Sequence, residues 1–337
     1  MTDIAPALEA PAYRSRYLSR HPLAAFTIRR ILTGLLGLFA VSVIVFAATQ
    51  VLPGNAAVQI LGRNATPQAV AQLSRQLGLD RSALAQYVSW LGGLLHGNLG
   101  RSLAAQEPVS QFIGDRVRNT LVLAGVAVAL MIPLGLGLGI IAGVRRDRPT
   151  DHAVTGFTLG AIALPEFVTG ALLALIFGVW LSVLPPVSLV PPGSDPLAHP
   201  AILVLPVLTL LLSGTAYIAR MMRAGVIEAM GSDYVEAAVL NGIGRRRIIW
   251  KHALRNALAP TVQVLALTVQ WLVGGVVVTE TIFSYPGLGQ GLVQAVQLRD
   301  LPVVQAVTML LAAVYITINI VADLLVVLLI PKLRTAQ

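Results

Sequence analysis

The chain has 337 residues, of which 56% are hydrophobic and only 12% charged, and its formal net charge is +9. The charged fraction is about half that of a typical soluble globular domain, which excludes a water-soluble fold and indicates a membrane protein. The sequence contains no cysteine, so disulfides and cysteine-ligated metal centres are also excluded.

Six apolar runs are long enough, or nearly so, to cross about 30 Å of hydrocarbon as a helix. We therefore predict an all-α polytopic membrane protein with six transmembrane helices. The predicted spans cover residues 31–52, 121–144, 154–184, 202–218, 261–279 and 303–330.

The expected organisation follows from these spans. Listed in chain order, it has an N-terminal tail at 1–28, the first span at 29–52, a loop with short helices at 53–119, a five-span core at 120–332 that includes a polar segment at 220–258, and a short tail at 333–337.

Basic residues are distributed unequally between the loops. Five lie before residue 31, three at 145–148, seven between 219 and 260 and two at the C-terminus, whereas six of the remaining seven lie in the long 53–119 loop. Short cytoplasmic loops of membrane proteins are rich in Lys and Arg, and long translocated loops escape this rule. We expect both termini in the cytoplasm, and the positive charge requires no nucleic-acid partner.

The first apolar run is too long for the core of a cleavable signal peptide, so we expect it to remain as a membrane anchor. In the loop that follows, Thr66 and Pro67 are typical of a helix start, and Gly78 is a suitable stop. The loop after the third span is rich in proline and lacks Lys and Arg, as expected outside the cell.

Gly135, Gly139 and Gly143 recur every four residues in the second span. This spacing leaves a strip without side chains along one helix face, where another backbone can approach closely. The strip is consistent with ordinary helix packing or with a surface that slides during function.

A polar stretch at 231–260, GSDYVEAAVLNGIGRRRIIWKHALRNALAP, separates the fourth and fifth spans. Asp233 is a candidate N-cap, and Glu236 lies three residues later as in a capping box. Val235, Ala238 and Val239 form a narrow apolar stripe at helical spacing. So short a helix is marginal in water, which favours a docking site over a plain basic loop.

Gly242 and Gly244 are expected to end this helix by adopting left-handed backbone conformations. A second helix is predicted from Arg245. On it, Arg247, Lys251 and Arg255 form a ladder of like charges, which is unfavourable unless lipid phosphates or an acidic protein surface lie opposite.

The motif EAAVLNG at 236–242 resembles the cytoplasmic signature of inner-membrane permease subunits of binding-protein-dependent ABC importers. The longer match YVEAAVLNGIGRRRIIWKHALRNALAP resembles the peptide and nickel branch, which includes dipeptide and oligopeptide permeases. So do VVVTETIFSYPGLGQGLVQAV, and LPGNAAVQILG and YVSWLGGLLHGNLGRSL in the first loop. The resemblance runs from about residue 29 to 333.

The resemblance implies that the 236–242 helix is a coupling helix between spans 4 and 5, seated in a groove on a cytoplasmic ATPase. The residues expected to make this ATPase contact are Tyr234, Glu236, Ala237, Ala238, Asn241, Gly242, Ile243 and Gly244.

The same resemblance implies several partners. They are a second homologous permease, two P-loop ATPases or one fused ATPase, and an extracytoplasmic substrate-binding protein, all assembled at the bacterial inner membrane. The chain has only two lysines, and neither follows a G-x-x-x-x-G segment, so we expect no cofactor in this chain and ATP-Mg in the partners. Import would proceed by alternating access.

Dipeptides or oligopeptides are the expected cargo, with nickel, glutathione or oligosaccharides as alternatives. The five histidines show no metal-ligand spacing and no nucleophile motif is present, so we expect a transporter subunit and not an enzyme. A secondary transporter or channel subunit is a more distant alternative, because no internal symmetry is visible.

Three carboxylates lie within predicted spans, where charges are costly. Glu166, directly after Pro165, either lines the translocation path or forms a hydrogen bond between helices. Glu280 is expected to cap the loop that follows the fifth span. Asp323, with Thr317 and Asn319 nearby, is explained either by a polar contact with the sister permease or by a gate.

Overall fold

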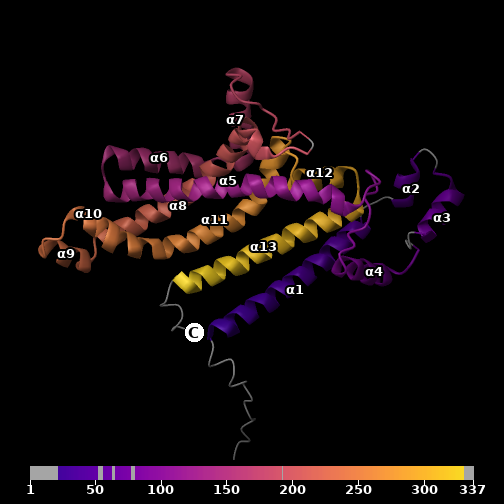
Figure 1. Ribbon diagram of the computed structural model, residues 1–337, viewed down its shortest axis with the longest axis horizontal. Helices are drawn as coiled ribbons and strands as arrows, with labels where there is room; N and C mark the ends of the chain where they lie inside the picture. Colours follow the sequence, from indigo (N-terminus) through magenta and orange to yellow (C-terminus); the bar gives the residue numbers. More distant parts are fainter. Residues whose placement is uncertain (1–21, 52–55, 63–64, 77–79, 192, 330–337) are drawn as a thin grey trace, which may run out of the picture.

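The computed structural model describes residues 22–51, 56–62, 65–76, 80–191 and 193–329 (Figure 1). The predicted tail at 333–337 and most of the tail at 1–28 lie outside these residues. The described part of the chain is helical and has no strand. Its main helices are α1 (Pro22–Val51), α2 (Ala56–Leu61), α3 (Pro67–Gln76), α4 (Ala83–Leu95), α5 (Val109–Val144), α6 (Pro149–Ala163), α7 (Glu166–Leu173), α8 (Pro200–Met230), α9 (Asp233–Leu240), α10 (Arg245–Arg247), α11 (Leu254–Ile282), α12 (Leu288–Gln297) and α13 (Leu301–Leu329).

Five continuous helices in the described residues are long and apolar enough to cross a membrane. They are α1, α5, α8, α13 and the run from α10 to α11, which a π-helical segment at Ile248–Ala253 makes continuous. Two of these runs, α8 and the run from α10 to α11, extend beyond the predicted spans at both ends, because polar residues continue the helices past the hydrocarbon. The other three, α1, α5 and α13, begin earlier than predicted.

The third predicted span, 154–184, is not one helix. α6 and the run from α7 through the π-helical segment Ala174–Trp180 meet at an angle of 104°. Leu164 is extended, with φ −90° and ψ 126°, because the residue before a proline is forced away from the helical region. The sequence predicts one span here, and the bend divides it: α7 projects away from the layer of α5 and α6 (Figure 1). The third predicted span is therefore a bent pair of helices, which forms either a broken span or a re-entrant loop.

The glycine strip of α5 lies against α8. A Cβ placed on Gly139 would come within 2.6 Å of the Ala219 carbonyl oxygen, and one on Gly143 within 2.7 Å of Val226 Cβ. Gly135 meets Ile218 in the same way, at 2.7 Å. The prediction of close backbone approach is confirmed, and ordinary packing accounts for the spacing of the three glycines.

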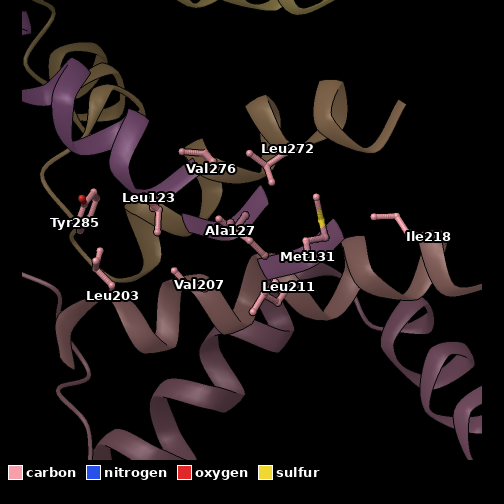
Figure 2. Close-up of a cluster of buried hydrophobic side chains, with 11 residues drawn as sticks. Leu123, Ala127, Met131, Leu203, Val207, Leu211, Ile218, Leu272, Val276 and Tyr285 are labelled. Atoms are coloured by element: carbon pink, nitrogen blue, oxygen red, sulfur yellow. The ribbon is translucent and has the colours of Figure 1, made fainter. Parts of the chain in front are cut away.

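The largest buried cluster lies where α5, α8 and α11 meet (Figure 2). α8 is the most buried of the spans, because it has packing partners on several sides. In water such packing would be driven by apolar burial, but within lipid it depends on close van der Waals fit. The labelled members of the cluster are Leu123, Ala127, Met131, Leu203, Val207, Leu211, Ile218, Leu272, Val276 and Tyr285.

The first loop confirms the predicted helix start at Thr66 and contains hydrogen bonds to Asp300 that were not predicted. The Ala69 amide donates a 3.2 Å hydrogen bond to the Thr66 hydroxyl at the start of α3, whereas Gly78 lies outside the described residues. Further on, the buried Asp300 carboxylate accepts hydrogen bonds from the Ser102 hydroxyl and from the amides of Leu103 and Ala104. The end of the loop is thereby fixed to the start of α13.

Candidate coupling site and intramembrane carboxylates

The short helix α9 forms as predicted, but its N-cap differs from the expected one. Ser232 holds the N-cap position, and its carbonyl accepts the amides of Val235 and Glu236 at 2.9 and 3.1 Å. Its hydroxyl donates a 2.5 Å bond to the Ala229 carbonyl and so does not cap the helix. Asp233 is already inside the first turn, where its charge favours the helix dipole. The predicted side-chain cap by Asp233 is wrong.

The inner face of α9 is closed by its own chain. Val235 and Ala238 are 3% and 6% exposed and pack on Ile248, which is 1% exposed. Val239, expected on the same stripe, is instead 58% exposed. The short helix is held by the start of the following span, so the apolar stripe is not available to an ATPase.

The outer face of α9 is exposed. Of the eight residues predicted to contact an ATPase, Ala238 is buried and Ile243 is half-buried. The other six are exposed: Tyr234, Glu236, Ala237, Asn241, Gly242 and Gly244. Sequence reasoning missed Leu240, which is 82% exposed. The available signal was its spacing, because Leu240 follows Ala237 by three residues and so lies on the same helix face.

A tight turn joins α9 to α10. Gly242 has φ +75°, and the Ile243 amide donates to the Ala238 carbonyl at 3.1 Å while the Gly242 amide donates to the Val239 carbonyl at 2.9 Å. This pair of bonds is the Schellman motif. Gly244 has φ −60° and ψ 140° and is the N-cap of α10, so its predicted left-handed conformation is wrong.

The base of the following span presents the predicted basic ladder. Arg247, Lys251 and Arg255 are exposed, and none of them forms an ion pair with a residue that the structure describes. Arg245 points differently, since its guanidinium donates a 3.4 Å bond to the Val144 carbonyl at the end of α5.

An ion pair that no sequence pattern predicts lies between α6 and α8. Arg223 Nε and Nη2 donate to the two carboxylate oxygens of Asp151 at 2.5 and 2.8 Å. The Asp147 amide donates to the same carboxylate at 3.0 Å. The pair fixes the loop between α5 and α6 beside the contact of Gly139 and Gly143 with α8.

Glu280 lies fully buried at the end of α11 and acts as the cap that the sequence predicted. Its carboxylate accepts the Thr120 hydroxyl at 2.6 Å and the Gly289 and Gln290 amides at 2.7 and 3.2 Å. The two amides belong to the first turn of α12, where a negative charge is favourable. No side chain fits beside it, because a Cβ on Gly287 would overlap the carboxylate.

Glu166 and Asp323 both find partners within the chain. Glu166 is half-buried, accepts the Thr279 hydroxyl at 2.7 Å and lies over Gly275 of α11. This geometry accords with a hydrogen bond between helices, and a role in the translocation path stays a prediction. Asp323 forms a 3.1 Å ion pair with Arg30 of α1, so its polar contact does not require a sister permease.

The described residues include no group of three or more His, Asp or Glu side chains that could hold a metal. The bent helix pair, the five continuous spans and the exposed turn of α9 define a multi-pass membrane protein with a free helical surface at one end of its bundle.

The comparison with protein families identifies the family of membrane proteins to which the chain belongs. Residues 135–335 match the family described as the binding-protein-dependent transport system inner membrane component, and residues 23–124 match its N-terminal region. The chain belongs to this family and is an inner-membrane permease subunit of an ABC importer of the peptide and nickel branch.

Similar proteins match along nearly the whole chain. A putative peptide transport system permease protein of Brucella abortus (strain 2308) is 36% identical over 312 residues, which cover 93% of this chain and 99% of the relative. The glutathione transport system permease protein GsiC of Escherichia coli (strain K12) is 35% identical over 92% of this chain and 98% of its own. A probable peptide ABC transporter permease of Sinorhizobium fredii is 31% identical over 93% and 100%.

Proposed function

We propose that the chain forms half of a translocation pathway that imports peptides by alternating access, driven by ATP hydrolysis in separate subunits. The support for the cargo is that the relatives named above are named for peptides and for glutathione, which is itself a modified tripeptide. Glutathione is therefore the nearest alternative, ahead of nickel and oligosaccharides.

The observation that carries the coupling mechanism is that α9 is buried on one face and exposed on the other. Its inner face is packed on Ile248, and its outer face exposes Tyr234, Ala237 and Leu240. A helix fixed to the base of a span transmits a push, whereas a free loop absorbs it. We assign this outer face to the contact with a cytoplasmic ATPase, which places α9, both termini and the basic ladder in the cytoplasm.

The proposed assembly contains a second homologous permease, two ATPases or one fused ATPase, and an extracytoplasmic binding protein. ATP-Mg would be held by the ATPases and no cofactor by this chain. Closure of the ATPases on ATP would move α9, and the shift would favour one of the two access states of the spans.

The test is to replace Gly242 by Asp and measure uptake of a labelled dipeptide into cells or proteoliposomes. The side chain adds bulk and charge at the exposed turn beside the proposed interface, where φ is +75°. We expect uptake to fall by roughly tenfold or more, with the amount of chain in the membrane unchanged.

Gly231→Asp is the matched control, because Gly231 is also exposed and next to α9 but has φ −91° and lies at the end of α8. It should retain uptake. Normal uptake by Gly242→Asp, with normal membrane amounts, contradicts the coupling assignment.

Purification of the tagged chain from native membranes, followed by mass spectrometry, tests the partners. Recovery of a second permease and P-loop ATPases supports the assembly, and recovery of the chain alone contradicts it. Competition of labelled dipeptide uptake by unlabelled glutathione then separates the two cargo alternatives.

A further inference from the structure

Helix α4 lies in the first loop, yet its 13 residues, ALAQYVSWLGGLL, include no charged side chain. An uncharged helix is unusual for a segment surrounded by water, where charged residues normally dominate one face. The Ser82 hydroxyl caps its N-terminus by accepting the Ala85 amide, so the helix is well defined.

One arc of α4 packs on the last turns of α1. Tyr87 and Ser42 share a 2.8 Å hydrogen bond, and Gln50 Nε2 donates to Gln86 Oε1 at 2.9 Å. Phe46 packs against two rings of α4, with centroids 5.3 Å from Tyr87 and 5.8 Å from Trp90. α4 is therefore held against α1 (Figure 1).

The contacts fix the depth of α4 relative to the apolar span. The candidate span of α1, Ala24–Gln50, is 27 residues long, which is about 40 Å of helix against about 30 Å of hydrocarbon, and it includes Arg29 and Arg30 near its first end. Ser42 lies eight residues before Gln50 and so about 12 Å inside that end. Because Tyr87 reaches Ser42, α4 lies at the level of the bilayer boundary and not above it.

A second arc of α4 carries an apolar stripe that no described residue covers. Leu84, Val88 and Leu95 are 72%, 60% and 79% exposed, and they recur at spacings of four and seven. Ser89 lies on a third arc, about 100° around the helix from Val88. The helix thus has a face for α1, an uncovered apolar face and a small polar face.

We propose that α4 is an interfacial helix whose stripe of Leu84, Val88 and Leu95 is buried in the acyl chains of the leaflet at the Gln50 end of α1. The neighbouring helix α1 also exposes apolar side chains, since Phe39 and Ile44 are 54% and 65% exposed. Tyr87 and Trp90 then lie at the boundary, where these residue types are enriched. The lipid anchors the loop at a fixed height beside the span.

The absence of cysteine makes a direct test practical. Single Val88→Cys and Ser89→Cys variants carry a nitroxide label, and the assembly purified from native membranes is placed in lipid nanodiscs. Power-saturation EPR then measures collisions with oxygen, which concentrates in lipid, and with a water-soluble nickel chelate. Neither substitution removes a buried contact, since both positions are exposed.

The expected result is a higher ratio of oxygen to nickel collisions at position 88 than at position 89, by about tenfold, with position 84 and position 95 behaving as position 88. Two results overturn the proposal. Equal ratios at positions 88 and 89 mean that the stripe faces water. A label at position 88 that neither reagent reaches means that a protein partner covers it.

This test does not depend on the ATPase contact, because it measures depth in lipid and needs no transport. Failure of the Gly242→Asp experiment therefore leaves it unaffected, and the reverse also holds.

Discussion

The α5–α8 contact and the turn after α9 both depend on glycine, but they use the missing side chain in different ways. At Gly139 the backbone is an ordinary helix, and the missing Cβ leaves room for the Ala219 carbonyl. At Gly242 nothing lies within 4 Å of a Cβ, and the requirement is the left-handed φ of +75°. The first use fixes distance between spans, and the second fixes the direction of the chain.

The largest expected effect comes from adding a side chain at Gly139, where the missing Cβ sets the distance between α5 and α8. Gly139→Leu places side-chain atoms against backbone that cannot withdraw, so we expect a loss of about 3 kcal/mol of unfolding free energy, or no folded protein. Gly137→Leu is the control, because a Cβ there has nothing within 4 Å. Thermal unfolding in detergent checks both, and equal stability of the two variants would mean that the α5–α8 approach is looser than described.

A third kind of glycine sharpens the comparison. Gly287 leaves room for a buried carboxylate, so Gly287→Ala should displace Glu280 from the first turn of α12 and cost about 2 kcal/mol. Hydrogen exchange of the Gly289 and Gln290 amides reports the loss of the cap directly. Gly274→Ala, on the span that carries Glu280 but with open space around its Cβ, should leave their exchange unchanged.

At Gly242, which sets the direction of the chain, stability should depend less on the volume of the new side chain and more on whether the residue tolerates left-handed backbone. Gly242→Val forces a β-branched residue into the left-handed region, at a cost of about 1–2 kcal/mol, whereas Gly244→Val at φ −60° should cost little. Trypsin cleavage at Arg245, Arg246 and Arg247 measures opening of the turn. Faster cleavage only in Gly242→Val is the expected result; equal cleavage in both variants contradicts the distinction.

The smallest effect is expected at an exposed polar contact. The Leu197 amide, together with Arg118 at 2.6 Å, lowers the pKa of Asp195 from 3.8. A carboxylate with a lowered pKa stabilises the fold above its unfolded-state pKa, and the contribution is lost as the pH falls through the folded-state value. Asp195→Asn should therefore be slightly less stable than the wild type at pH 7 and equal to it well below pH 3.8. A difference that persists in acid contradicts this.

Much of the bundle was predictable because its spans are long and apolar. Hydrophobic length alone located the spans, the Gly135 spacing indicated a close helix contact, and the residues of 231–260 indicated a short helix before the fifth span. The size of the bend at Pro165 was not predictable, because a proline in a span is compatible with a mild kink or with a full break.

At the candidate site the sequence predicted which residues cluster but not which of them are covered. Val235 and Ala238 form an apolar stripe, and only the structure shows that Ile248, ten residues after Ala238, packs against it. The Arg223 and Asp151 pair was also invisible, since the two residues are 72 positions apart and no local rule connects them. Long-range partners of this kind depend on how the spans pack.

The packing of α9 on Ile248 has a mechanical consequence. Ile248 belongs to an unbroken helical run from Arg245 to Ile282, 38 residues or about 55 Å long. At the opposite end of that run, Glu280 holds the first turn of α12. A displacement at the α9 end is therefore carried toward α12 along one continuous helix, except for what the π-helical segment at Ile248–Ala253 and Pro260 absorb by bending.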